Sequence, residues 1–199
     1  MQKPLLILAS QSPRRQEILS LALIPFETVS VDTPELFVPG FSIEENVRRI
    51  ALEKAEAAAA TKSLLNRETI ILTADTVVVR DGEVLGKPVG CSQALSMLQS
   101  LQNRMHTVCT GFALLSGEES YTECVTTSVE FLPMTDEEIM RYLDTVKPYD
   151  KAGSYGIQDP LMACHIKRIE GCYYNVVGLP LSSVCNALKR FMQAYPAIP

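Results

Sequence analysis

Histidine is scarce in this sequence, and cysteine never occurs in closely spaced pairs. The two histidines are His106 and His165, and the six cysteines are scattered without a Cys-x-x-Cys pair. A zinc site built on paired ligands and a dense disulfide framework are therefore excluded. A nucleophilic triad would need one of the two histidines as its base, and neither has a convincing serine or cysteine partner.

The sequence also lacks long apolar runs, a P-loop and an excess of positive charge. The first apolar run, Leu5 to Ala9, stops at Ser10, too short for a membrane-spanning helix, and no cleavage-like segment accompanies it. No Gly-x-x-x-x-Gly-Lys-Ser/Thr motif occurs. The formal net charge of -5 argues against a broad nucleic-acid-binding surface. We therefore expect a cytoplasmic protein whose partner is neither a membrane nor a nucleic acid.

The composition and the order of the predicted elements indicate the fold class. With 199 residues, 47% of them hydrophobic and 21% charged, the chain is typical of one globular domain over residues 1–199, and no repeat or linker divides it. Strands and helices alternate in the first half, and a meander dominates the second. This pattern predicts an α/β fold with a mixed sheet and flanking helices.

Periodicity and turn signals place the individual elements. Strands are expected over 5–9, 70–79, 84–85, 107–115, 121–132 and around Glu170-Gly171. Helices are expected over about 13–23 with Ser12 as N-cap, from the Ser42/Glu45 capping box, after an N-cap at Ser92, from the Thr135/Glu138 capping box, and over about 181–191. In the second of these helices Lys54 shares a face with Ile50 and Ala51, which puts a charge on an apolar stripe.

The segment Ser10-Gln11-Ser12-Pro13-Arg14-Arg15 predicts an anion site. It joins a buried strand to a helix, so free backbone amides, the hydroxyls of Ser10 and Ser12, and the guanidiniums of Arg14 and Arg15 meet at one helix start. A polyphosphate needs directed donors and permanent positive charge of this kind. Two alternatives stay open at this point: a capped helix with surface arginines, and a minor-groove DNA contact, which the acidic net charge opposes.

Asp75 stands inside the apolar run Ile70 to Val79, where a carboxylate is costly unless something pairs with it. One alternative is a structural carboxylate that is hydrogen-bonded to backbone. The other is a metal-assisted phosphate site: Glu35 would add a second hard oxygen ligand, while Lys54 and Lys87 would neutralise phosphate. Mg²⁺ commonly takes one or two protein carboxylates and completes its shell with water and phosphates. The residues thus indicate a metal-assisted enzyme acting on phosphates, with Mg²⁺ or Mn²⁺ as the cofactor.

Several motifs in order resemble the Maf family of nucleoside-triphosphate pyrophosphatases, over nearly the whole chain. They are Leu-Ala-Ser-Gln-Ser-Pro-Arg-Arg at 8–15, Glu35, the segment from Arg49 to Lys54, Ala74-Asp75-Thr76, Gly86-Lys87-Pro88, Asp150 to Gln158, and Val177-Gly178-Leu179-Pro180. The resemblance implies a fold similar to that of inosine-triphosphate pyrophosphatase, with two lobes around a central cleft, and a possible homodimer. One departure is Asp159-Pro160-Leu161, where the family usually has glycines after the glutamine.

The resemblance also implies a reaction, which is hydrolysis between the α- and β-phosphates to a nucleoside monophosphate and pyrophosphate. The family's acidic catalytic residue falls on Asp75, which would bind the metal or orient the attacking water, with Glu35 helping to hold the metal. Charge on the phosphates would be stabilised by Arg15, Lys54 and Lys87.

The family's substrate-selecting positions fall on Arg14, Thr76 and Gln158. These residue types resemble the branch that acts on dTTP and UTP, rather than the branch that acts on 7-methyl-GTP. A competing hypothesis is a nucleotide-binding regulator of cell division with little turnover. Retention of Asp75, Lys54 and Lys87 favours an enzyme, since binding alone needs fewer charges. Tyr155, beside the glycines of its loop, either stacks on a base or is structural.

Overall fold

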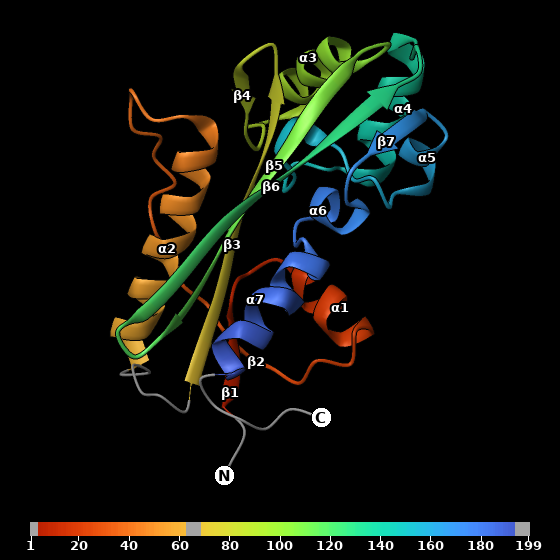
Figure 1. Ribbon diagram of the computed structural model, residues 1–199. Coiled ribbons are helices and arrows are strands. Elements are labelled where there is room, and N and C mark those ends of the chain that lie inside the picture. The colour runs from red at the N-terminus through yellow and green to blue at the C-terminus, as the bar shows by residue number, and fades with distance from the viewer. Residues whose placement is uncertain (1–3, 63–68, 194–199) are drawn as a thin grey trace. The chain divides into compact units, whose positions relative to one another are not determined.

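A computed structural model describes residues 4–62 and 69–193 (Figure 1). Within them, seven strands form one mixed sheet with flanking helices, which confirms the predicted α/β class. The strands are β1 Leu5–Ala9, β2 Glu27–Val29, β3 Thr69–Arg80, β4 Glu83–Leu85, β5 Met105–Ser116, β6 Glu119–Phe131 and β7 Ile166–Glu170. The helices are α1 Pro13–Leu21, α2 Ile43–Lys62, α3 Cys91–Leu101, α4 Asp136–Val146, the 3-10 turn η1 Ala152–Ser154, α5 Pro160–Ala163, α6 Tyr173–Val177 and α7 Leu181–Gln193.

The sheet order is β2-β1-β3-β5-β6-β7, and β4 pairs with the C-terminal end of β3. Strand β1 runs parallel to both β2 and β3, with Leu8 opposite Thr28 on one side and Leu72 on the other. The β3–β4 and β6–β7 pairs are antiparallel. Because β3 lies inside the sheet, its residues from Thr69 to Asp75 are all buried, and its sequence shows no alternation of apolar and polar residues.

The chain divides into two compact units, as the predicted two lobes require. The first comprises the described residues within 1–75, 110–125 and 178–199, and the second comprises 76–109 and 126–177. Each unit is described by itself below.

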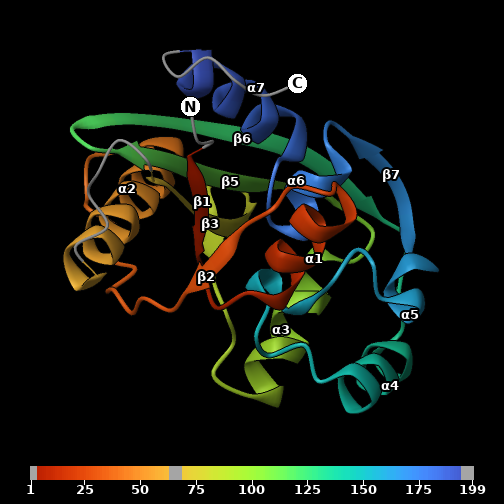
Figure 2. The ribbon, with the colours of Figure 1, turned by 90° about the horizontal axis from the view of Figure 1, so that it is seen from below.

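In the first unit, helix α2 lies very close to the sheet. Alanines along α2, among them Ala51 and Ala55, pack against Ile7 of β1 and Ala113 of β5, and Figures 1 and 2 show α2 on the face opposite α1 and α7. At Gly111 of β5, an added Cβ would lie 2.4 Å from the carbonyl carbon and oxygen of Val47. The contact between helix and strand therefore requires glycine at this position, a need that no turn or periodicity in the sequence signals.

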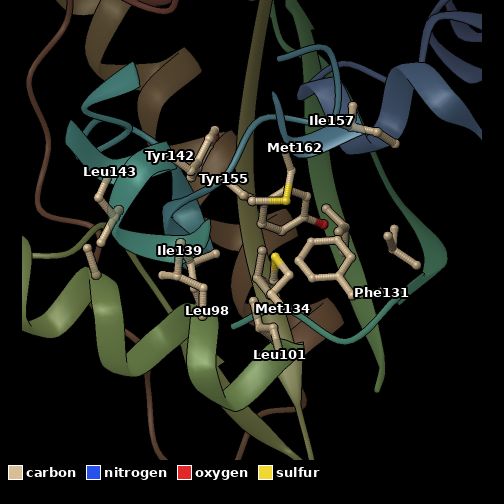
Figure 3. Close-up of a cluster of buried hydrophobic side chains, with 14 residues drawn as sticks. Leu98, Leu101, Phe131, Met134, Ile139, Tyr142, Leu143, Tyr155, Ile157 and Met162 are labelled. Carbon is tan, nitrogen blue, oxygen red and sulfur yellow. The ribbon is translucent and has the colours of Figure 1, made fainter. Parts of the chain in front are cut away.

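The core of the second unit gathers side chains from α3, α4 and the segment around η1 (Figure 3). Tyr155 lies within this core, 5% exposed, with its ring edge-to-face against Phe131 at 4.9 Å between centroids. Its hydroxyl is 2.7 Å from Nε2 of His106. The structure therefore supports the structural alternative for Tyr155 rather than the base-stacking one.

Both predicted capping boxes are confirmed. The Ser42 N–H donates to the Glu45 carboxylate at 2.7 Å and the Glu45 N–H to the Ser42 hydroxyl at 3.1 Å, and Thr135 and Glu138 exchange the same pair of bonds.

Three predicted boundaries are wrong for local reasons. Helix α1 ends at Leu21 instead of Leu23, since Leu23 adopts a left-handed conformation with φ 55°. Helix α3 is capped by the extended Gly90 and not by Ser92. Strands are predicted on both sides of Glu170-Gly171, but only β7 forms and α6 follows it: Gly171 has φ 129°, and the next N–H, of Cys172, bonds to the Thr127 hydroxyl at 3.1 Å.

In the described part of the chain, no helix has both the length and the apolar character needed to cross a membrane.

We expect His106 to make the folding stability of the protein depend on pH. Burial lowers the pKa of His106 from 6.5 to about 4. Between these values the unfolded chain binds the proton more readily, so the contribution of His106 is fully present above pH 6.5 and is lost as the pH falls towards 4. The free energy of unfolding should decrease by about 3 kcal/mol from this group.

Urea unfolding of the wild type and of His106→Gln between pH 4 and 8 measures this effect. The variant should show a flatter pH profile than the wild type. An unchanged slope in His106→Gln would show that another group is responsible.

Candidate active site

The start of α1 is organised by Ser10, which immediately follows β1. The Ser10 hydroxyl oxygen accepts two hydrogen bonds at 3.2 Å each, from the backbone N–H of Ser12 and from Nη1 of Arg15. Ser12 occupies the N-cap position and Pro13 the first helical position as predicted, but the Ser12 side chain makes no capping bond. The sequence therefore identified the helix start, while the interaction that shapes it comes from Ser10.

Arg15 is held by contacts from a distant part of the chain. Its Nε donates to the carbonyl oxygen of Gly178 at 2.8 Å. Burial lowers the pKa of Arg15, the carboxylates of Asp75 and Glu35 raise it, and the neighbouring Arg14 lowers it. The guanidinium is thus electrostatically coupled to both predicted metal ligands. Sequence reasoning noted the motif around Gly178 only through the family resemblance and missed that its carbonyl anchors the arginine.

Lys54 joins the two predicted carboxylates. Its Nζ donates to Oδ1 of Asp75 and to Oε1 of Glu35, at 2.7 Å in each case. The Lys54 side chain is 12% exposed, that of Asp75 8% and that of Glu35 44%. An ammonium group has three N–H donors, so the two bonds leave one further donor. The structure therefore brings together Lys54, Asp75 and Glu35 from three separate segments of the sequence.

The packing of α2 on β3 places Lys54 against Asp75. The Thr73 hydroxyl donates to the Ala51 carbonyl at 2.5 Å, in a fully buried contact. Thr73 and Asp75 point to the same face of β3 because side chains alternate along a strand. Ala51 and Lys54 lie on the same face of α2 because they are three residues apart. The Thr73–Ala51 hydrogen bond thus fixes the register in which the charged pair Lys54–Asp75 forms. The charge of Lys54 on the predicted apolar stripe is explained by its ion pair with Asp75.

The loop that carries Glu35 is tied to α2 by two further side chains. Asn46, only 1% exposed, accepts from the Val38 N–H at 2.7 Å and donates to the carbonyls of Val38, Phe41 and Ser42. Arg49 donates to the carbonyl of Leu36 and pairs with Glu53. Sequence reasoning did not identify Asn46. A buried asparagine four residues after a helix N-cap gives little signal in the sequence, because its partners are backbone groups of a loop.

The donor set fits a divalent cation of the hard type. Asp75 and Glu35 offer carboxylate oxygens, which Mg²⁺ and Mn²⁺ prefer, and Lys54 engages one oxygen of each. Within residues 4–62 and 69–193 there is no cluster of three or more His, Cys, Asp or Glu side chains able to hold a metal. In a site of this kind the two carboxylates would be the protein ligands, and phosphate and water would supply the rest.

Three predicted site residues belong to the second unit. Thr76 follows Asp75 on β3 and is partly buried, Lys87 is exposed in the segment after β4, and Gln158 is exposed in a turn after η1. Their association with the first unit's cluster stays a prediction.

Comparison with known proteins identifies the fold and the family of this chain. A solved HAM1 protein from Coxiella burnetii superposes with a TM-score of 0.51 over 94% of this chain and 99% of that one, at 14% sequence identity, which concerns the fold alone. The family described as Maf-like protein matches residues 5–191. The chain therefore belongs to the Maf-like family.

Relatives in this family are close in sequence. A protein of Pelodictyon phaeoclathratiforme named dTTP/UTP pyrophosphatase is 66% identical over 192 residues, which is 96% of this chain and all of that protein. A protein of the same name from Bacillus velezensis is 43% identical over 186 residues, covering 94% of this chain and 96% of that protein.

We expect Asn46→Ala to release the loop that carries Glu35. The change removes the acceptor for the Val38 N–H and the donor for three loop carbonyls, and the cost should be roughly 1–3 kcal/mol for the buried groups left unpaired. Hydrogen exchange of the Val38 amide should accelerate strongly, and Asn186→Ala, an exposed change on α7, should leave it unaffected. Undiminished protection of Val38 in the folded Asn46 variant would show that Arg49 alone suffices.

Proposed function

We propose that this protein hydrolyses dTTP and UTP between the α- and β-phosphates, releasing the nucleoside monophosphate and pyrophosphate. The observation that carries the proposal is the largely buried Lys54 ammonium, bonded to two carboxylates whose charge also acts on Arg15. Family membership and the names of the relatives support the same reaction and substrates.

The triphosphate would bind at the start of α1. The first N–H groups of a helix point at an anion placed there, and the helix dipole adds favourable potential. Arg14 and Arg15 contribute permanent positive charge, and the Ser12 hydroxyl is not spent on capping the helix. Ser10 acts by orienting Arg15, since its oxygen accepts from that guanidinium while its own O–H proton can donate to phosphate.

Asp75 and Glu35 would hold a divalent cation, which when bound would neutralise phosphate charge and act as a Lewis acid. In this scheme the Asp75 carboxylate also accepts a hydrogen bond from the attacking water. Lys54 holds both carboxylates in place, and its third N–H donor, together with Arg15 and Lys87, stabilises charge that develops on the phosphates.

Base selection would depend on Gln158, Thr76 and Arg14. The glutamine amide offers one acceptor and a pair of donors, which complement the N3–H and a carbonyl of thymine or uracil. The positively charged 7-methylguanine would be opposed by Arg14 and would favour an aromatic face or a carboxylate.

Asp75→Asn should abolish most turnover and leave the protein folded. The amide keeps the shape of the side chain but removes the negative charge that a cation and an attacking water need. The loss should be on the order of 100-fold or more, typical of a principal catalytic group. Pyrophosphate release with Mg²⁺ or Mn²⁺ measures it.

Asp81→Asn is the matched control for Asp75→Asn. Asp81 lies in the exposed β3–β4 turn at φ 51°, a conformation that asparagine tolerates, so this variant should retain activity. Near-normal turnover in a folded Asp75→Asn protein would refute the assignment. A wild type that binds nucleotide without turnover would support the regulator hypothesis.

The substrate preference follows from the glutamine. Under one metal condition, dTTP and UTP should be hydrolysed more efficiently than CTP and 7-methyl-GTP, and Gln158→Ala should lose the discrimination. A base edge left unpaired costs roughly 1–3 kcal/mol, which is visible in relative kcat/KM. A clear preference for 7-methyl-GTP would contradict the choice of substrate and leave the pyrophosphatase reaction standing.

A further inference from the structure

Gln158 stands at the tip of a tight turn in the second unit. The turn is closed by the Asp159 N–H, which donates to the Gly156 carbonyl at 3.1 Å, so Ile157 and Gln158 are its two central residues. Ile157 belongs to the buried core of the second unit and is 5% exposed (Figure 3). Gln158, by contrast, is exposed. One side chain of the turn is thus anchored and the next one is presented to the outside.

A single phenol oxygen holds both ends of this turn. The Tyr142 hydroxyl accepts from the Gly156 N–H at 3.0 Å and donates to Oδ2 of Asp159 at 2.7 Å. Tyr142 lies on α4 and is 3% exposed. Burial and the hydrogen bond to Asp159 raise its pKa, so the phenol keeps the proton that it donates. The geometry therefore links α4 to the turn that carries Gln158 through one atom.

The residues at and after the end of the turn complete this arrangement. An added Cβ on Gly156 would lie 2.5 Å from Oδ2 of Asp159, so the Asp159 carboxylate folds back over Gly156. Lys151 lies 3.9 Å from the same oxygen. Pro160 then begins α5 and fixes the chain direction after the turn. Tyr142 thus supplies a hydrogen-bond donor to the charged side chain that ends the turn.

We propose that Tyr142 is a positioning residue for base selection, acting on Gln158 through the turn from Gly156 to Asp159. This inference rests on the proposed role of Gln158 as the reader of the pyrimidine base. Tyr142 itself does not touch the substrate. Its hydroxyl limits the conformations of the turn. The Gln158 amide is therefore already ordered before the base binds, and less conformational entropy is lost on binding.

The test is the ratio of kcat/KM for dTTP to that for CTP. In Tyr142→Phe this ratio should fall by about three- to tenfold, as expected for a hydrogen bond lost from a positioning group. Tyr155→Phe is the matched control, because it removes a buried phenol oxygen from the same core that bonds to His106 instead of the turn. It should keep the wild-type ratio.

Three further variants separate positioning from general structural damage. Asp159→Ala removes the partner at one end of the turn and should reduce the ratio, while Asp159→Asn keeps an acceptor for the Tyr142 hydroxyl and should restore it. In a Gln158→Ala background, Tyr142→Phe should cause no further change in the ratio, because the residue through which it acts is gone. An unfolding curve measured for each variant confirms that the variant is folded under the assay conditions, so that the kcat/KM ratios compare folded proteins.

The outcomes distinguish this inference from the proposed function. If Gln158→Ala lowers the ratio and both Tyr142→Phe and Asp159→Ala leave it unchanged, the positioning role is overturned and base reading by Gln158 stands. If Gln158→Ala itself leaves the ratio unchanged, the proposed base recognition is wrong and the positioning role falls with it. Additive losses in the double variant would also overturn the proposal.

Discussion

The ion pairs of Lys54 with Asp75 and Glu35 are the interaction on which the first unit depends. Removing a carboxylate and an ammonium from water costs several kcal/mol of solvation free energy each. Their mutual attraction offsets this cost only if the geometry of the pair is good. Two bonds of 2.7 Å supply that geometry. Loss of one partner would leave an uncompensated charge, so each of the three residues constrains the other two. The same pairing fixes the position of both carboxylates, which a cation or an attacking water needs.

That geometry is set by close packing rather than by the charged groups themselves. A salt bridge between side chains of a helix and a strand forms only if the helix lies at the correct height and register. Gly111 sets the height, because any side chain there would displace the α2 backbone at Val47. The Thr73–Ala51 hydrogen bond sets the register. Asn46 fixes the position of the loop that carries Glu35, because its side chain accepts a hydrogen bond from the Val38 N–H. A glycine, a threonine and an asparagine thus determine where three charges meet.

Sequence reasoning found the groups that bear charge and missed those that place them. Asp75 was conspicuous because a carboxylate interrupts an apolar run, and Lys54 because a charge interrupts an apolar helix face. Both signals are local. Gly111 carries no such local signal, since the requirement for glycine arises from the backbone of α2 at Val47, far earlier in the chain. The anchoring of Arg15 by the Gly178 carbonyl was equally hidden, because backbone acceptors carry no side-chain identity. Helix ends were missed where a left-handed residue or an extended glycine decides them.

The turn of Gln158 shows how a tertiary hydrogen bond restricts the conformation of a turn. Glycines after a recognition residue permit a tight turn but widen the range of unfolded and alternative conformations. Asp159 and Pro160 narrow that range, and they introduce a carboxylate that needs a donor. Tyr142 provides this donor from α4, so the constraint on the turn passes from the backbone to a tertiary hydrogen bond. Under the proposed role of Gln158, base selection would depend on the packing of α4, and a substitution in that helix would alter substrate preference while the proposed phosphate-binding residues of the first unit stay unchanged.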